Sequence, residues 1–379
     1  MIIGIDGNEA NVSTKVGIGE YSFQLLRQLK KCQMSSVRQA QDKNVKCQIY
    51  LKEQPRSDLP KESDQWQYRV VKPKKLWTQI GLPLDLYTHF PRPDVFFTPS
   101  HYAPRFSPIP TVISIMDLSY IYFPSLFNPS DLYQLKNWTE YSAKNATMIL
   151  TISEASKHDI MRVYGISKDR IRVTYPGLKM PYSDSAASME VLQNTYHVNG
   201  EYILFVGTLQ PRKNIEKLIE AFAKVVKTHK TLSLVIVGKH GWLYESILRA
   251  PKRFGIEQSV KFLSFVPDQD LAVFYKHAVC YILPSLYEGF GLPVLEAMSY
   301  DCPVITSNIS SLPEAAGEAA LYVDPKNSDD IEAKITEIVE NPSLRKELIE
   351  KGKKQIKKFS WEKTAKETLA VLEVVGKGS

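Results

Sequence analysis

The sequence has few of the features that mark secreted, metal-binding and membrane-spanning proteins. It contains only four cysteines, and none stands in a CxxC pair or at zinc-ligand spacing, which excludes a disulfide framework and predicts reduced, structural thiols. No apolar run approaches the roughly 18 residues of a membrane span. The start, MIIGIDGN, lacks the basic and apolar regions of a signal peptide, so we expect a cytoplasmic protein. The cysteines are Cys32, Cys47, Cys280 and Cys302.

Length and composition predict two folded domains. A single core usually stops growing at about 250–300 residues, and this chain has 379. With 44% hydrophobic and 23% charged residues, it is typical of a globular protein and can bury a substantial core. Its formal net charge of +7 suits a protein that binds phosphates, an anionic membrane or nucleic acid, and the charge alone does not choose between them.

Strand and helix patterns alternate in both halves of the chain. From residue 201 onward, apolar runs such as YILFVGT, LSLVIVGK and CYILPS are separated by amphipathic stretches such as KNIEKLIEAFAKVV. The first half alternates with more interruptions, and a segment at 175–200 rich in Pro, Gly and Ser separates the halves. The pattern predicts an α/β protein with two Rossmann-like, doubly wound domains, residues 1–181 and 182–358, facing a cleft. Residues 359–379 add one more helix.

Two carboxylates stand in the loop and helix after the strand CYILPS. Gly289 and Gly291 open the helix that carries Glu296, and free N–H groups at a helix start can bind an anion. Glu288 and Glu296 are eight residues apart, so they can address opposite ends of one ligand and accept hydrogen bonds from sugar hydroxyls. A surface salt bridge would explain either acid alone. Since Glu288 lies in a predicted loop, we expect its removal to reduce activity with little loss of stability.

A basic pair and a glycine-rich loop follow two other strands. Arg212 and Lys213 in VGTLQPRKN precede a long helix, where cations are unfavourable unless they bind an anion such as a departing diphosphate. In the first half, Gly17 and Gly19 in VGIGEYSFQLL allow close approach of backbone to a phosphate where a helix begins. A simple tight turn would also explain these two glycines.

The two landmarks of the second half resemble those of a known enzyme family. EGFGLPVLE resembles the E-x7-E signature of the retaining GT-B glycosyltransferases, the large family of glycosyl transferases group 1 (family 4), and FVGTLQPRKN is similar to that family's second landmark. The resemblance covers nearly the whole chain and is most specific from Tyr202 to Pro325. It implies the GT-B fold and a hexosyltransferase activity. It also implies that the last helix packs back on the N-terminal domain.

The resemblance implies roles for individual residues. Glu288 would contact the donor sugar, Glu296 the ribose, and Arg212 with Lys213 the diphosphate. We group Asp117 with Glu288 and the basic pair as catalytic candidates. The remaining donor-binding candidates are glycines and their neighbours at the strand ends: Gly17, Gly19, Thr208, Gly289, Phe290, Gly291 and Leu292.

One position departs from the family pattern. The family carries His-Asp after the strand that here reads TVISIMDLSY, so Met116 replaces the histidine while Asp117 remains. The nearby His101 in TPSHYAP is a candidate to occupy similar space on the acceptor side, although a lone histidine after a strand is more often structural. His101 and Met116 are therefore acceptor-side candidates.

These observations predict a retaining transferase that moves a hexose, with mannose first by resemblance, from a nucleotide diphosphate sugar to a glycan or lipid-linked acceptor. A sugar-nucleotide epimerase and a glycan phosphorylase are alternatives, because they use paired Rossmann domains. A basic nucleic-acid-binding protein is the alternative from another class, but its basic residues lack interleaved aromatics. We expect no nucleic-acid partner.

We expect no cofactor and no metal. Arg212 and Lys213 could neutralise the diphosphate without a metal ion. Asp268 and Asp270 in FVPDQDL stand at a helix start, where we expect them to cap the helix.

Lysines concentrate in the first 80 residues and predict a reversible, peripheral contact with the inner face of the membrane. Scattered solvated charge is the alternative explanation, since lysines also protect sheet edges. The lysines concerned are Lys30, Lys31, Lys43, Lys46, Lys72, Lys74 and Lys75.

Overall fold

The computed structural model describes residues 1–38, 45–178 and 189–378. The chain forms two compact units, and unit 1 is discontinuous in sequence. Unit 1 comprises Met1–Gly177 and Phe359–Ser379, and unit 2 comprises Leu178–Lys358. The domain boundary expected at residue 181 lies outside the described residues.

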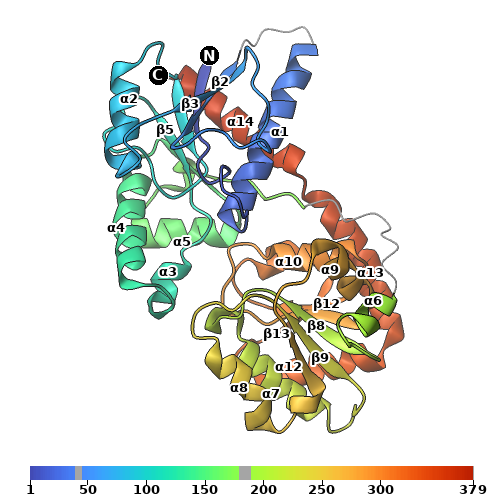
Figure 1. Cartoon of the computed structure of the whole chain (residues 1–379). Helices are drawn as coiled ribbons and strands as arrows, with labels where there is room; N and C mark the ends of the chain where they lie inside the picture. Colours follow the sequence, from blue (N-terminus) through green and yellow to red (C-terminus); the bar gives the residue numbers. More distant parts are fainter. Residues whose placement is uncertain (39–44, 179–188, 379) are drawn as a thin grey trace. The chain divides into compact units, whose positions relative to one another are not determined.

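The described part of unit 1 contains a seven-stranded, wholly parallel sheet (Figure 1). Its strand order is β3-β2-β1-β4-β5-β6-β7, so β1 pairs with β2 on one side and with β4 on the other. Such a reversal of direction opens a crevice beyond the strand ends in doubly wound sheets. The strands are β1 (Ile2–Asp6), β2 (Lys46–Leu51), β3 (Trp66–Val70), β4 (Val95–Thr98), β5 (Thr111–Ser114), β6 (Met148–Thr151) and β7 (Ile171–Val173).

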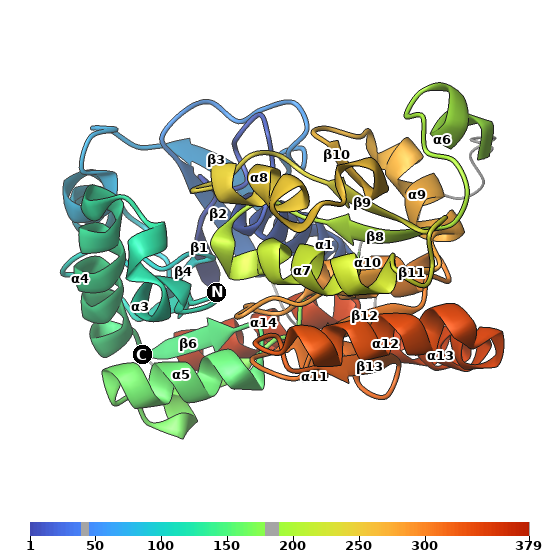
Figure 2. The same cartoon turned by 90° about the horizontal axis from the view of Figure 1, so that it is seen from below.

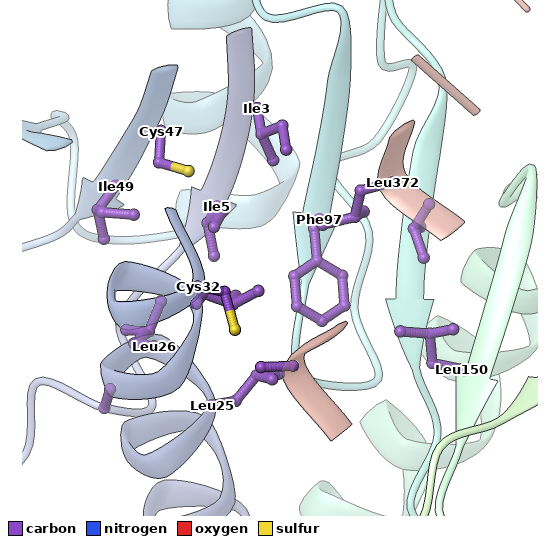
Figure 3. Packing of buried hydrophobic residues seen from close by; sticks show 14 of the residues in the cluster. Ile3, Ile5, Leu25, Leu26, Cys32, Cys47, Ile49, Phe97, Leu150 and Leu372 are labelled. Atoms are coloured by element: carbon purple, nitrogen blue, oxygen red, sulfur yellow. The ribbon is translucent and has the colours of Figure 1, made fainter. Parts of the chain in front are cut away.

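Helices cover both faces of this sheet because successive strand residues point to opposite faces. In β4, Val95 and Phe97 pack into the core beneath α1 and α14, whereas Phe96 packs beneath α2. Figure 3 shows the first of these cores, where Ile5 of β1 and Phe97 lie among side chains of the surrounding helices. The helices are α1 (Ile18–Arg38), η1 (Trp77–Gly81), α2 (Leu82–Thr88), α3 (Ser119–Tyr122), η2 (Pro124–Leu126), α4 (Pro129–Asn145), α5 (Glu154–Tyr164), η3 (Lys168–Arg170) and α14 (Trp361–Lys377).

The last helix, α14, packs on α1, β4 and β6 and is part of the unit 1 core. Its N-cap is Ser360, whose hydroxyl accepts a hydrogen bond from the backbone N–H of Lys363 at 3.1 Å. The ring of Trp361 meets Tyr21 of α1 edge to face, with centroids 5.6 Å apart. A Cβ atom on Gly177 would lie 2.5 Å from Trp361 Cγ, so only glycine allows the chain to pass this close.

The described part of unit 2 contains a six-stranded parallel sheet in the order β10-β9-β8-β11-β12-β13. It reverses direction between β8 and β11, as the sheet of unit 1 does between β1 and β4. The strands are β8 (Tyr202–Val206), β9 (Ser233–Val237), β10 (Val260–Leu263), β11 (Cys280–Leu283), β12 (Val304–Ser307) and β13 (Ala320–Val323).

The unit 2 helices flank this sheet. Helix α12 lies beside β13 and α7 and leads into α13 (Figure 2). In the described residues, no helix is both long and apolar enough to cross a membrane. The helices are α6 (Met189–Asn194), η4 (Pro211–Lys213), α7 (Ile215–Val225), α8 (Glu245–Phe254), η5 (Glu257–Ser259), α9 (Asp268–His277), α10 (Leu292–Ser299), α11 (Leu312–Ala316), α12 (Ser328–Glu340), α13 (Pro342–Gln355) and η6 (Ile356–Lys358).

Candidate active site

Two loops at the carboxyl edge of the unit 2 sheet bring the predicted acid and the predicted cations together. Strands β8 and β11 are neighbours, so the turn η4 after β8 lies beside the loop that joins β11 to α10. Lys213 Nζ donates to Glu288 Oε1 at 2.6 Å, and Arg212 Nη1 lies 3.1 Å from Glu288 Oε2. One carboxylate therefore binds both cations.

This ion cluster is buried. Glu288 and Lys213 are only 7% and 8% exposed, respectively, and Ser285 donates a further hydrogen bond to Glu288 Oε1 at 2.7 Å. Burial by itself raises the pKa of the Glu288 carboxyl, but the charges of Lys213 and Arg212 outweigh it and lower the pKa to about 2. Glu288 is therefore ionised at neutral pH.

Hydrogen bonds to backbone carbonyls hold the loop that carries Glu288 in place. The hydroxyls of Ser310 and Ser311 donate to the Glu288 carbonyl at 2.6 and 2.8 Å, and Leu286 N–H donates to the Arg212 carbonyl at 2.9 Å. These hydrogen bonds fix the position of Glu288 relative to Arg212. Glu288 lies in a loop, as expected, but it is buried and paired with the buried Lys213. We therefore expect its removal to lower stability as well as activity.

The glycines of this loop permit a sharp turn into α10. Gly291 is the N-cap of α10 with φ of 105°, which favours glycine, and a Cβ there would lie 2.8 Å from Leu312 Cδ2. Phe290 is buried and Gly289 lies next to it, while Leu292 begins the helix. All four residues predicted to bind donor in this segment thus lie next to Glu288.

The second predicted acid, Glu296, lies within α10 and is partly buried. Burial raises the pKa of Tyr281 well above its usual range, and the charges of Glu288 and Glu296 raise it further. Both carboxylates therefore lie near the tyrosine that follows Cys280 in β11. Thr208, the remaining predicted donor residue of unit 2, is exposed in the loop after β8.

The predicted unit 1 residues follow the carboxyl ends of β1, β4 and β5. Gly17 is exposed with φ of 52°, and a Cβ on Gly19 would lie 3.1 Å from the Glu9 carbonyl at the start of α1. Burial lowers the pKa of His101, and the nearby charge of Asp117 opposes this shift. Asp117 also accepts a hydrogen bond from Ser119 N–H at 2.8 Å. Met116, next to Asp117, is buried and packs in the core with α1 and α14.

Sequence analysis missed Asp6, which ends β1 beside these residues. Its Oδ1 accepts hydrogen bonds from Asn8 N at 3.0 Å and Asn8 Nδ2 at 2.6 Å. Burial raises the pKa of Asp6 to about 6, and the charge of Glu9 adds to this effect while that of Lys52 opposes it. The signal in the sequence is IDGN, an acid at the end of a buried strand followed by glycine.

Replacing Asp6 with asparagine should stabilise the protein at neutral pH. A carboxyl whose pKa rises from 3.8 to about 6 on folding costs stability as pH rises through that window. The variant should therefore gain roughly 3 kcal/mol in unfolding free energy at pH 7 and nothing below about pH 4, as measured by urea denaturation. Asp58→Asn is the control, because Asp58 is an exposed acid that pairs with Lys15, so its replacement should bring no gain. Equal stability of Asp6→Asn and the wild type at pH 7 would contradict the burial of charge at Asp6.

Asp268 and Asp270 occupy the first turn of α9, where their charge suits the helix dipole, and the N-cap position itself is Pro267. Asp270 also accepts a hydrogen bond from the Tyr196 hydroxyl at 2.6 Å. Among the described residues, no group of three or more His, Cys, Asp or Glu side chains is arranged to hold a metal ion.

Comparison with solved structures identifies the class of fold. Sucrose-phosphate synthase from Thermosynechococcus elongatus matches with a TM-score of 0.74 at 17% identity over 100% of both chains. Anabaena Alr3699/HepE, solved in complex with UDP and glucose, matches with a TM-score of 0.71 at 17% identity, covering 98% of this chain and 99% of that chain. The two doubly wound units thus have the GT-B fold, which confirms the expected fold class.

Sequence comparison then gives the family. The family profile described as "Glycosyl transferases group 1" matches residues 193–355. O-antigen chain mannosyltransferase B of Escherichia coli is 34% identical over 307 residues, which cover 80% of this chain and 78% of that protein. The chain belongs to the glycosyl transferases group 1 family and is a glycosyltransferase, as the resemblance predicted.

Proposed function

We propose that the protein transfers mannose, with retention of configuration, from a nucleoside diphosphate sugar to a glycan or lipid-linked acceptor. The observation that carries this proposal is the buried cluster of Glu288 with Lys213 and Arg212 at the carboxyl edge of β8 and β11. A diphosphate needs cations, and a sugar needs hydrogen-bond acceptors beside them. The similarity to a mannosyltransferase of Escherichia coli favours mannose, and GDP-mannose is the first donor to test.

Each side chain has a role in this proposal. Arg212 and Lys213 bind the diphosphate and stabilise the charge that develops as it leaves. Glu288 accepts hydrogen bonds from the transferred sugar, and Glu296 from the ribose. The acceptor oxygen forms its bond to the anomeric carbon on the face from which the diphosphate oxygen departs, and that oxygen takes the acceptor proton. No metal ion is needed for this charge balance.

On the acceptor side, we propose that His101 and Asp117 contact the acceptor. Their positions after β4 and β5 place them at the carboxyl edge of the unit 1 sheet, the edge at which doubly wound sheets bind ligands. We assign Met116 no direct contact with the acceptor, because its side chain packs against the apolar core of unit 1. We further propose that the protein meets its acceptor at the inner face of the membrane without spanning it.

Donor identity can be tested by thermal stabilisation with GDP, UDP, ADP and their sugars. A ligand at about 100 times its dissociation constant adds roughly 2.7 kcal/mol to the unfolding free energy, so the correct donor should stand out. We expect GDP-mannose to stabilise the protein most. Anomeric configuration in the product, read by NMR, then tests retention. A product of inverted configuration would refute the mechanism, and stabilisation by UDP-glucose alone would refute the choice of sugar.

Arg212→Ala and Lys213→Ala should each weaken binding of the nucleoside diphosphate by roughly 1.5–3 kcal/mol, because each loses a charge-assisted hydrogen bond. Calorimetric titration with the diphosphate measures this directly. Arg253→Ala is a suitable control, since Arg253 lies in the same unit and its ion pair with Glu216 is exposed. If both site variants bound the diphosphate as the wild type does, the cations would have another role.

A further inference from the structure

A short helical segment of unit 1 and its flanking residues expose five large apolar side chains. Ile80, Leu84 and Tyr87 are spaced by four and three residues along η1 and α2, so they lie on one side of this helical segment. Leu76 precedes the segment and Phe90 follows it, and the five side chains are 42–73% exposed. Single exposed apolar residues are ordinary, but a row of five marks an interaction surface.

The opposite side of the same segment is also apolar and is already buried. Trp77, Leu82 and Leu86 pack in a core with Tyr50 of β2 and Phe96 of β4. A helix at the surface of a globular protein normally carries polar side chains on its outer face. The outer face of η1 and α2 instead carries Ile80, Leu84 and Tyr87. These apolar side chains are exposed, so packing of the core does not account for them.

The charge around this row is positive. Lys72, Lys74 and Lys75 immediately precede it and are exposed. Between Val71 and Pro93 the sequence has one acid, Asp85, which is buried and accepts two hydrogen bonds from Arg69 at 2.7 and 2.8 Å. Lys74 pairs with Glu53 at 2.7 Å, and both of these side chains are exposed. The three lysines therefore exceed this exposed acid by two positive charges, which can attract an anionic surface.

At its other end the row finishes with aromatic residues beside an arginine. The Arg92 guanidinium lies 4.5 Å from the centre of the Phe90 ring and 5.9 Å from that of Tyr87. Aromatic rings with an adjacent cation suit the headgroup level of a bilayer, where the ring is apolar and the polar groups stay hydrated. Aliphatic side chains in the centre suit the acyl boundary below it.

We infer that this surface docks reversibly on a bilayer that contains anionic lipid. The α2 surface, as we name it, comprises Lys72, Lys74, Lys75, Leu76, Ile80, Leu84, Tyr87 and Phe90. The inference rests on the membrane contact proposed above and assigns it to named residues. Proteins bind the surface of an anionic bilayer by inserting apolar side chains and by placing cations beside the lipid headgroups. The sequence predicted a membrane contact made by lysines alone, and the inference adds the insertion of apolar side chains.

The lysines first grouped from the sequence do not form one patch. Lys46 begins β2, and Lys30 and Lys31 line a hollow with Asp64 and Gln65, just before β3 begins. These three lysines therefore lie toward the amino ends of the parallel strands. The three lysines of the α2 surface follow the carboxyl end of β3, and Lys43 lies outside the described residues.

Co-sedimentation with vesicles tests the inference. The full-length protein should bind vesicles of phosphatidylcholine with phosphatidylglycerol more tightly than vesicles of phosphatidylcholine alone, and added salt should weaken binding. Ile80→Ser with Leu84→Ser should lower binding to the anionic vesicles by roughly tenfold or more, as expected when two inserted aliphatic side chains are lost. Lys72→Gln with Lys75→Gln should remove most of the preference for anionic lipid. Val374→Ser is the matched control, because Val374 is 73% exposed on α14, which covers the other face of the sheet.

A second readout reports insertion rather than affinity. All four native cysteines are buried, and burial raises the pKa of Cys47 and of Cys280 to about 12, so an introduced surface thiol can be labelled selectively. A solvent-sensitive fluorophore on Leu84→Cys should shift to the blue and brighten with anionic vesicles. The same fluorophore on Val374→Cys should not respond.

Three outcomes would overturn the inference. They are equal binding to both kinds of vesicle, loss of binding only in Lys30→Gln with Lys31→Gln, and no response of the fluorophore at position 84. Self-association of the protein that Leu84→Ser abolishes, without vesicle binding, would assign the surface to a second copy of the chain. Each measurement is made without donor or acceptor. Failure here would therefore leave donor stabilisation, and with it the proposed transfer reaction, unaffected.

Discussion

Glu288→Gln should reduce the transfer rate by roughly 10²–10³ and also lower the unfolding free energy by about 3 kcal/mol. Activity falls because the carboxylate no longer accepts hydrogen bonds from the donor sugar. Stability falls because Lys213 and Arg212 are left near a neutral amide, and Lys213 is buried. Steady-state kinetics with the donor and urea denaturation measure the two effects.

The stability effect should depend on pH in a defined direction. The pKa of Glu288 falls from 4.5 to about 2 on folding, against the opposing effect of burial. Its contribution is therefore complete above about pH 4.5 and is lost as pH falls toward 2, so the wild type and Glu288→Gln should converge in stability over that range. Glu350→Gln is the control, since Glu350 pairs with Lys353 at the surface and should change little. A full loss of activity with unchanged stability at neutral pH would show that the ion cluster does not form in the free protein.

Removing Phe359–Ser379 should abolish the cooperative folding of unit 1. Helix α14 supplies Trp361, Ala365, Leu372 and Val375 to its core. The burial of a large apolar side chain contributes roughly 1.5–3 kcal/mol, and a typical domain is stable by only about 5–15 kcal/mol in total. Differential scanning calorimetry should show one unfolding transition lost.

A milder change, at the contact between Gly177 and Trp361, should also destabilise unit 1. Gly177→Ala places a methyl group against the backbone and ring of Trp361 and should lower the unfolding temperature of unit 1. Val374→Ser alters an exposed position of the same helix and should leave that temperature unchanged. A truncated protein that keeps both transitions would show that α14 is dispensable.

Several features of the fold follow from local patterns in the sequence. Runs such as YILFV and CYIL are apolar throughout because parallel strands with helices on both faces are buried on both sides. The stripe Ala365, Leu369 and Leu372 required burial somewhere, and the structure places it on α1 and the unit 1 strands. Neither pattern specifies which elements become neighbours, since that depends on strand order.

The limits of sequence reasoning are clearest at the site. Motif positions placed Glu288, Arg212 and Lys213 near one ligand, but not in contact with each other, because that contact depends on the pairing of β8 with β11 across about 75 residues of chain. The IDGN pattern marks Asp6 as an acid at a strand end, but its burial follows from the packing around it, which the pattern does not reveal. Met116 lies in the core because of the packing of α1 and α14, which no local pattern reveals.

The split of unit 1 between the two ends of the chain also sets an order for events on the ribosome. Residues 1–177 emerge before unit 2, but their core lacks the side chains of α14 until residues 361–377 have been synthesised. Unit 2 is continuous from Leu178 to Lys358, and the strands of its described part, β8 to β13, precede α14 in the sequence. The half of the enzyme that is synthesised first is therefore the half that finishes folding last, and it must keep an unfinished apolar surface from aggregating throughout translation.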